Sequence, residues 1–237
     1  MATEDDAASK FDARAHEYDR QSRIALAGYE ACHELAACML AAALGNDSPA
    51  RLLIVGSGTA QEVITIGALE PSWTFTAIDP SPAMVALARA KIEAAGLSAR
   101  VTMHLGYVDD LPPDAYDAAT LIGVLHHLSG HESKRKILTE IAARLKPAAP
   151  FVLACNHYEY GSQPLMLAAW RNRWRAQGMT PDEVDARLGK ILQGADPPSS
   201  ELAVADLLAE AGFGPPTRFF SSLFWGAWIT RKTAGEG

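Results

Sequence analysis

The fold is decided by residues 52–60, which have the sequence LLIVGSGTA. The four apolar residues predict a buried strand, and the glycines that follow predict a tight turn onto a helix. A second apolar run, 75–78, ends at Asp79, about 20 residues beyond the turn. Glycines let a backbone approach a ligand, and an acid accepts hydrogen bonds from ribose hydroxyls. The pattern therefore predicts a site for an adenosine-containing cofactor.

Segments that alternate between strand and helix patterns continue from this turn toward the C-terminus. Ser81 and Pro82 are typical of a helix start, and Gly96 is typical of a helix end. The expected strands are 52–55, 74–78, 100–105, 118–122 and 151–155, and the expected helices between them are 60–69, 82–95 and 132–145. This alternation predicts an α/β fold, with a Rossmann-like, doubly wound sheet covered by helices on both faces.

The remaining segments surround this core. Helical patterns at 11–20 and 22–44 predict N-terminal helices, and two more at 165–177 and 181–192 predict a cap over the carboxyl edge of the sheet. A helix at 200–211 and strands at 218–220 and 223–230 are expected to close the fold. The expected units are a disordered tail (1–10), an N-terminal helical lid (11–46), the core (47–155), a helical cap insertion (156–198) and a C-terminal helix with a β-hairpin (199–237).

Composition restricts the partners and the location. The chain has 237 residues, of which 49% are apolar and 21% charged, and this composition is typical of a globular protein. Its net charge of −7 disfavours nucleic acid as a partner. Cys32, Cys38 and Cys155 lack metal-ligand spacing and predict free thiols without a metal. The N-terminus is unlike a signal peptide, and no apolar run reaches the ~18 residues of a membrane span. We therefore expect a cytoplasmic protein with no membrane partner.

The order and spacing of the motifs resemble those of class I S-adenosylmethionine-dependent methyltransferases across nearly the whole chain. The matching segments are 53–59 (LIVGSGT), 78–84 (IDPSPAM), 101–106 (VTMHLG), 110–112 (DLP), 116–119 (YDAA), 124–128 (VLHHL), 145–147 (LKP) and 208–213 (LAEAGF). The resemblance implies a seven-stranded, mostly parallel sheet with an antiparallel last strand. It also implies that S-adenosyl-L-methionine (SAM) binds at the carboxyl ends of strands one to four, with S-adenosyl-L-homocysteine (SAH) as the product.

The resemblance also assigns cofactor contacts to particular residues. They are Gly56, Ser57 and Gly58 at the methionine moiety, Asp79 at the ribose, Pro80, Met84, Tyr107 and Val108 around adenine, and Gly123 and Val124 near the sulfonium.

Residues 11–19 resemble a stretch that folds over the cofactor in this superfamily, and residues 23–29 resemble a segment of carboxy-SAM synthases and their neighbours. Tyr18 is therefore a predicted lid residue. Arg23 either pairs with the cofactor's carboxylate or is a solvated helix arginine. Leu207 stands where those synthases have an arginine for their extra carboxylate, and this difference favours ordinary methyl transfer.

Three positions depart from the family pattern. Ile54 stands where the family commonly has an acid, Ala60 where it has a third glycine, and Tyr107 where it often has Asp. The contact to the cofactor's amino group must therefore come from elsewhere. A backbone carbonyl or Asp109 is expected to replace the partner of the adenine amine. The alternative is a degenerate domain that binds no cofactor.

Methyl transfer depends mostly on positioning the nucleophile, because the sulfonium is already an activated leaving group. We assign no catalytic residue, since a base is needed only if the nucleophile starts protonated. The candidates for the acceptor pocket are His126, His157, Tyr158 and Trp170, with a structural role as the alternative for His126. Trp170 and Trp174 are four residues apart among arginines, and this spacing favours core packing of the cap over stacking on nucleic acid.

The predicted function is transfer of a methyl group to an O, N or C nucleophile of a small molecule, by a monomer or homodimer. Three alternatives stay open. A tRNA-modifying relative would bind RNA with a steep salt dependence, and a non-catalytic regulator would bind SAM without turnover. A nicotinamide-dependent oxidoreductase would need glycine or alanine where Gln61 stands.

Overall fold

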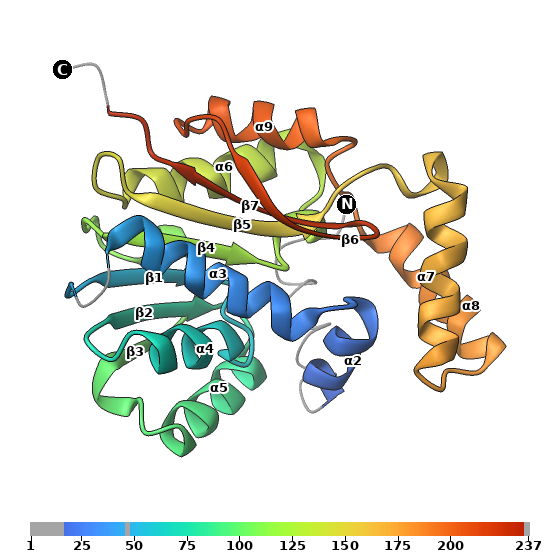
Figure 1. The fold of residues 1–237 in the computed structure, drawn as a ribbon, viewed down its shortest axis with the longest axis horizontal. Helices are drawn as coiled ribbons and strands as arrows, with labels where there is room; N and C mark the ends of the chain where they lie inside the picture. The colour runs from blue at the N-terminus through green and yellow to red at the C-terminus, as the bar shows by residue number, and fades with distance from the viewer. Residues whose placement is uncertain (1–16, 46–47, 235–237) are drawn as a thin grey trace.

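The computed structural model describes residues 17–45 and 48–234, and it contains one seven-stranded sheet with the order β3-β2-β1-β4-β5-β7-β6 (Figure 1). The strands are β1 Arg51–Val55, β2 Thr74–Asp79, β3 Val101–Leu105, β4 Ala118–Ile122, β5 Pro150–Asn156, β6 Thr217–Ser222 and β7 Trp225–Arg231. Strands β1 to β5 pair in parallel, whereas β7 runs antiparallel to both β5 and β6. The predicted doubly wound sheet with an antiparallel last strand is confirmed.

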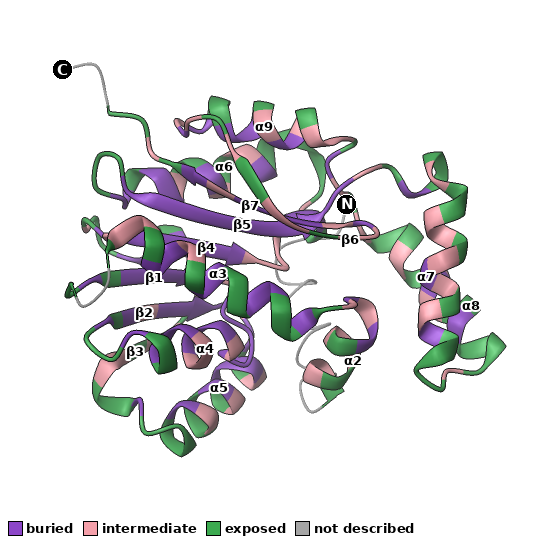
Figure 2. Ribbon diagram, viewed as in Figure 1, coloured by how far each residue is buried: buried purple, intermediate pink, exposed green. Residues whose placement is uncertain are grey.

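Helices cover both faces of the sheet. On one face lie α3 (Tyr29–Leu44), α4 (Gln61–Leu69) and α5 (Pro82–Ala94), and on the other lie α6 (Gly130–Ala143) and α9 (Glu201–Glu210). Figure 2 shows that β1, β4 and β5 are buried along most of their length. Continuous apolar strands such as residues 52–55 are therefore required, because the side chains on both faces of each strand are covered.

The N-terminal segment forms two helices, α2 (Tyr18–Ala25) and α3, which meet at Gly28. Gly28 has a φ of +83°, a left-handed conformation that glycine adopts without strain, so the chain turns where the sequence predicted one helix from 22 to 44. Within the described residues, no single helix is long and apolar enough to cross a membrane; α2 and α3 pass that test only as a pair bent by 88°. The predicted tail and residues 11–16 of the predicted lid lie outside the described residues.

The cap consists of α7 (Pro164–Ala176) and α8 (Pro181–Gly194), which lie beyond the carboxyl ends of the parallel strands (Figure 1). Trp170 and Trp174 are buried in its core, as the sequence predicted. The Trp170 indole N–H donates to the carbonyl of Ala25 at 2.6 Å, so the cap also packs against α2. The two ends of the cap insertion lie side by side, because the backbone N–H of Tyr158 donates to the carbonyl of Pro198 at 2.8 Å.

The closing hairpin differs from the prediction at its turn. Strand β6 is longer than expected, and β7 begins at Trp225 rather than 223. Leu223 has a φ of +52°, which marks the turn, and Phe224 is fully buried in the cap core. The turn therefore falls at residues 223–224, two residues later than the apolar pattern indicated, and Phe224 packs into the cap core.

The glycine turn after β1 is held by the neighbouring strands. The N–H groups of Gly56 and Ser57 both donate to the carbonyl of Ile78 at the end of β2, at 2.9 and 3.1 Å. A Cβ added to Gly56 would lie 2.2 Å from Cγ2 of Val124, the second residue after β4. Gly56 also has a φ of +66°, so the position excludes a side chain both sterically and conformationally.

We predict that Gly56→Ala lowers the free energy of unfolding by about 3 kcal/mol, through overpacking against Val124 and left-handed strain. Urea unfolding measures the loss. Gly96→Ala is the matched control, because Gly96 has a φ of +70° and no atom within 4 Å of an added Cβ. Strain alone should cost this variant about 1 kcal/mol. Equal losses in the two variants would contradict the close approach of Val124.

Candidate cofactor and acceptor site

Asp79 lies at the carboxyl end of β2 with its carboxylate fixed by two backbone donors. Gly58 N–H donates to Oδ2 at 2.8 Å, and Ser81 N–H donates to Oδ1 at 2.9 Å. A carboxylate oxygen accepts more than one hydrogen bond, so an oriented Asp79 can also accept from ribose hydroxyls. The geometry thus joins the glycine turn to the acid that the sequence placed one βα unit later.

Helix α2 covers the glycine turn, as the resemblance implied for a lid. A Cβ added to Gly58 would lie 3.5 Å from the Tyr18 ring, which shows that Tyr18 packs directly on the turn. The next residue, Asp19, accepts from the Thr59 hydroxyl at 2.5 Å and pairs with Lys91 on α5. Burial opposes ionisation of Asp19, but these two hydrogen bonds hold its pKa below the ordinary value.

Arg23 points elsewhere in this structure. Its Nε lies 2.5 Å from a carboxylate oxygen of Glu30, and its guanidinium carbon lies 5.3 Å from the centre of the Tyr29 ring. Its side chain is 44% exposed. The contact predicted between Arg23 and the cofactor's carboxylate therefore stays a prediction, and the structure shows a half-exposed ion pair.

The predicted adenine side is formed by the start of α5 and the segment after β3. Met84 and Val108 are buried, Pro80 is half-buried, and the N–H of Tyr107 donates to Asp110 at 2.8 Å. The sequence named Asp109 as one substitute for the missing acid at Tyr107. Asp109 pairs with Lys136 on α6 at 2.9 Å, and its contact with the adenine amine stays a prediction.

Ala60, which replaces the family's third glycine, keeps a glycine-like conformation. Its φ is +66°, and its N–H donates to Ser57 O at 2.8 Å. The turn thus has the same course that glycine would allow, at a cost of about 1 kcal/mol of left-handed strain.

Glu62 is a site residue that the sequence did not reveal. It lies in the first turn of α4, is only 4% exposed, and accepts a hydrogen bond from the Thr120 hydroxyl at 2.8 Å. Thr120 pairs with Ile54 in the register of β4 and β1, so the carboxylate lies at the position where the family's acid is missing. Burial raises the pKa of Glu62 to about 8.

Gly123 and Val124 connect the glycine turn to a second group of residues, which includes Trp225 and His126. Val124 packs on Gly56, as described above, while a Cβ on Gly123 would lie 3.7 Å from the Trp225 ring. The Trp225 ring in turn lies edge-on to His126, with centroids 5.2 Å apart. The site is therefore continuous from the glycine turn to the start of β7.

His126 is a buried, neutral imidazole. Its Nδ1 accepts the backbone N–H of Asn156 at 3.4 Å, so the ring proton is on Nε2. Burial, helped by the neighbouring His127 ring, lowers the pKa of His126 well below its ordinary value. His126 can therefore donate a hydrogen bond from Nε2, but it is poorly suited to take a proton.

The other predicted pocket residues lie differently. His157 is fully buried against Trp228, with its Nδ1 donating to Phe224 O at 3.1 Å, and burial lowers its pKa. Tyr158 is half-buried beside His157, and Trp170 is in the cap core. Trp228 belongs to the core beneath α6 and α9. Among the described residues, no hydrogen bond or ring contact joins His157, Tyr158 or Trp170 to His126. The pocket roles of these three residues stay predictions.

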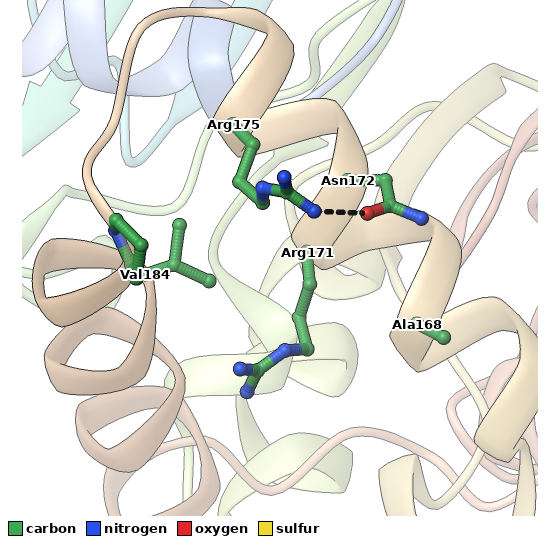
Figure 3. Close-up of a pocket in the computed structure, with 6 residues that line it drawn as sticks. Ala168, Arg171, Asn172, Arg175 and Val184 are labelled. Atoms are coloured by element: carbon green, nitrogen blue, oxygen red, sulfur yellow. Dashed lines mark hydrogen bonds between the residues drawn. The ribbon is translucent and has the colours of Figure 1, made fainter.

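A separate hollow of about 320 Å³ lies between α7 and α8 (Figure 3). Arg175 donates to Asn172 at 3.2 Å there, and Arg171 pairs with Asp185. None of the lining residues belongs to the predicted site. They are Ala168, Arg171, Asn172, Arg175, Pro181 and Val184.

Known proteins are similar in sequence to the part of the chain that forms the sheet and the glycine turn. Residues 53–151 match the model of a methyltransferase domain family. An uncharacterised protein of Synechococcus is 31% identical over 99 residues, which make up 41% of this chain and 23% of the relative. The chain thus spans less than a quarter of the length of the curated relative that it matches.

Solved structures resemble nearly the whole chain. A 1,6-didemethyltoxoflavin N1-methyltransferase of Burkholderia thailandensis, with 1,6-didemethyltoxoflavin and SAH bound, is 21% identical with a TM-score of 0.65 over 96% of this chain and 88% of that chain. An O-methyltransferase family 2 protein of Planctomyces limnophilus, in complex with apigenin, is 16% identical with a TM-score of 0.69 over 98% of this chain and 62% of that chain.

The sheet order, with its antiparallel last strand and its acid after β2, defines a Rossmann-like α/β enzyme fold. Residues 53–151 match a methyltransferase domain, as the motifs indicated.

We predict that Glu62→Gln removes a pH dependence of stability. The folded pKa of about 8 lies above the ordinary 4.5, so the folded state keeps a proton that the unfolded state loses between these values. The free energy of unfolding of the wild type should therefore fall as pH rises from 5 to 8, by about 1 kcal/mol per pH unit. Urea unfolding at both pH values measures this slope.

The control for Glu62→Gln is Glu132→Gln, which alters an exposed carboxylate on α6. Glu132→Gln should keep the wild-type slope, and Glu62→Gln should flatten it. The same slope in all three proteins would show that Glu62 ionises normally.

Proposed function

We propose that this chain transfers the methyl group of SAM to a small-molecule acceptor by in-line displacement. The observation that supports this function best is the continuity of the site. Asp79 and the glycine turn lie next to Val124, and Gly123 leads directly to the buried group of His126 and Trp225. A nucleophile held at that group would face the end of the cofactor at which the methyl group is carried.

The residues present fit the cofactor. Asp79 is oriented for the ribose hydroxyls, and Gly56 and Gly58 place no side chain between the turn and the methionine moiety. Tyr18 closes the turn from the side of α2. When bound, the cofactor supplies an electrophilic methyl group on a sulfonium.

Glu62 is proposed to hold the cofactor's amino group in place of the acid missing at Ile54. A buried carboxyl is costly to ionise without a cation nearby, and an ammonium group would supply one. The hydrogen bond from Thr120 fixes one carboxylate oxygen at 2.8 Å, which leaves the other oxygen for this contact.

The protein residues proposed to face the methyl acceptor are better suited to position it than to remove a proton from it. His126 is neutral with its proton on Nε2, so it orients an acceptor as a donor rather than as a base. Such a site suits an acceptor whose nucleophile is already deprotonated or loses its proton to solvent.

A small molecule is favoured over RNA as the acceptor. One solved relative holds 1,6-didemethyltoxoflavin and another holds apigenin, both of them small molecules. The arginines at 171, 173 and 175 are each bonded within the cap or to α2, as solvated rim residues would be. The cytoplasmic location and the monomeric or homodimeric state stay predictions.

Calorimetry with SAM, SAH and NAD tests the cofactor. We predict that the adenosyl ligands bind and NAD does not, and that Asp79→Asn weakens SAH binding by about 10- to 100-fold, since hydrogen bonds to a charged acceptor are lost. Asp114→Asn, at a surface pair with Arg51, is the control and should bind SAH normally. Tight NAD binding without SAH binding would overturn the proposed function.

Turnover is tested with the same variant. Wild-type protein and SAM with a labelled methyl group should label a compound in a fractionated small-molecule extract, and Asp79→Asn should not. SAH binding without any labelled product would favour the non-catalytic regulator instead.

Binding of SAH should also release protons if Glu62 faces the amino group. The ammonium lowers the pKa of a carboxyl that is protonated in the free protein, so Glu62 ionises on binding. Calorimetry at pH 7 in two buffers of different ionisation enthalpy measures this release. Glu62→Gln should bind SAH about tenfold more weakly and release no proton. Unchanged proton release in this variant would exclude the assignment.

A further inference from the structure

Two buried polar atoms lie opposite each other at the carboxyl end of β5. Asn156 ends β5 and pairs with Trp225, the first residue of β7. Side chains of directly paired residues point to the same face of a sheet. Within the described part of the chain, Oδ1 of Asn156 and Nε1 of Trp225 are both buried without a hydrogen-bond partner. One is an acceptor and the other is a donor.

His126 joins these two residues into one cluster. Its Nδ1 accepts the backbone N–H of Asn156, and its ring contacts the edge of Trp225. Asn156 is 4% exposed, and its Nδ2 donates to the hydroxyl of Tyr160 at 2.8 Å. The amide nitrogen is thus held by Tyr160, while its oxygen is left without a hydrogen-bond partner.

Buried polar atoms without partners are rare in folded proteins, because each one loses its hydrogen bonds to water. An apolar residue at either position would avoid this cost. An acceptor and a donor side by side, next to the Nε2–H of His126, instead complement a ligand that offers a donor beside an acceptor.

We propose that this cluster binds the methyl acceptor through a lactam or imide edge, that is, a ring N–H beside a ring carbonyl. The ring N–H donates to Asn156 Oδ1, and the carbonyl accepts from Trp225 Nε1. The inference rests on the proposed function, which places the acceptor here. It narrows the acceptor class to planar heterocycles with such an edge, and Gly123, which lies between this cluster and Val124, adds no side chain there.

The test uses SAH-loaded protein and three probes of matched shape: quinolin-2(1H)-one, its 1-methyl derivative and its 3-methyl derivative. Methylation at N1 removes the donor, whereas methylation at C3 adds the same bulk and keeps the lactam. Quenching of tryptophan fluorescence measures binding. The wild type should bind the two lactams about tenfold or more tightly than the 1-methyl compound, since that compound leaves Asn156 Oδ1 unpaired.

Variants separate the two contacts. Asn156→Ala should bind the lactams as weakly as the 1-methyl compound, and Trp225→Phe should weaken all three probes about tenfold. Tyr160→Phe removes the other partner of the Asn156 amide and should keep the lactam preference. Trp174→Phe is the matched control, because Trp174 also has a buried indole N–H without a partner but lies in the cap core.

The outcomes distinguish this inference from the function on which it rests. If SAH binds but the wild type does not prefer the lactams, or binds no probe, the lactam edge is wrong and the methyl-donor site stands. A lactam preference that persists in Asn156→Ala overturns the assignment of Asn156. Failure of SAH to bind wild-type protein overturns both proposals. Circular dichroism confirms that each variant is folded.

Discussion

The close approach of Gly56 and Val124 is the constraint on which the site depends. It brings the ends of β1 and β4 together, while the bonds from residues 56 and 57 to Ile78 attach the same turn to β2. Three strand ends thereby meet at one point of the sheet. The carboxyl ends of parallel strands are where doubly wound sheets bind ligands, and here the meeting point is set by a missing side chain.

The lid and the cap are attached to this point from opposite sides. Helix α2 bonds to the glycine turn through Asp19, and it bonds to the cap through the carbonyl of Ala25. The end of the cap returns to the sheet at Asp196, whose N–H donates to His126 O and whose carboxylate pairs with the buried Lys134. The cap is thus fixed to the backbone of His126, whose ring contacts Asn156 and Trp225.

The sequence could predict the sheet, with the glycine turn and Asp79 at its strand ends, because these features follow from local patterns. Apolar runs, caps and a glycine turn are read within a few residues, and Asp79 follows its strand directly. Glu62, Asn156 and Trp225 could not be found in this way. Each looks ordinary alone, and its role depends on the register that sets Thr120 beside Ile54 and Asn156 beside Trp225.

The alternation along β5 gives Asn156 and its predicted neighbour His157 different surroundings. The sequence places Asn156 and His157 together at the end of one strand, but successive side chains point to opposite faces. Asn156 meets His126 and Trp225, whereas His157 meets Trp228 on the side of α9. Strand pairing alone decides which of the two polar side chains lies beside His126 and Trp225. The same rule makes Trp225, rather than the more deeply buried Trp228, the tryptophan that borders His126.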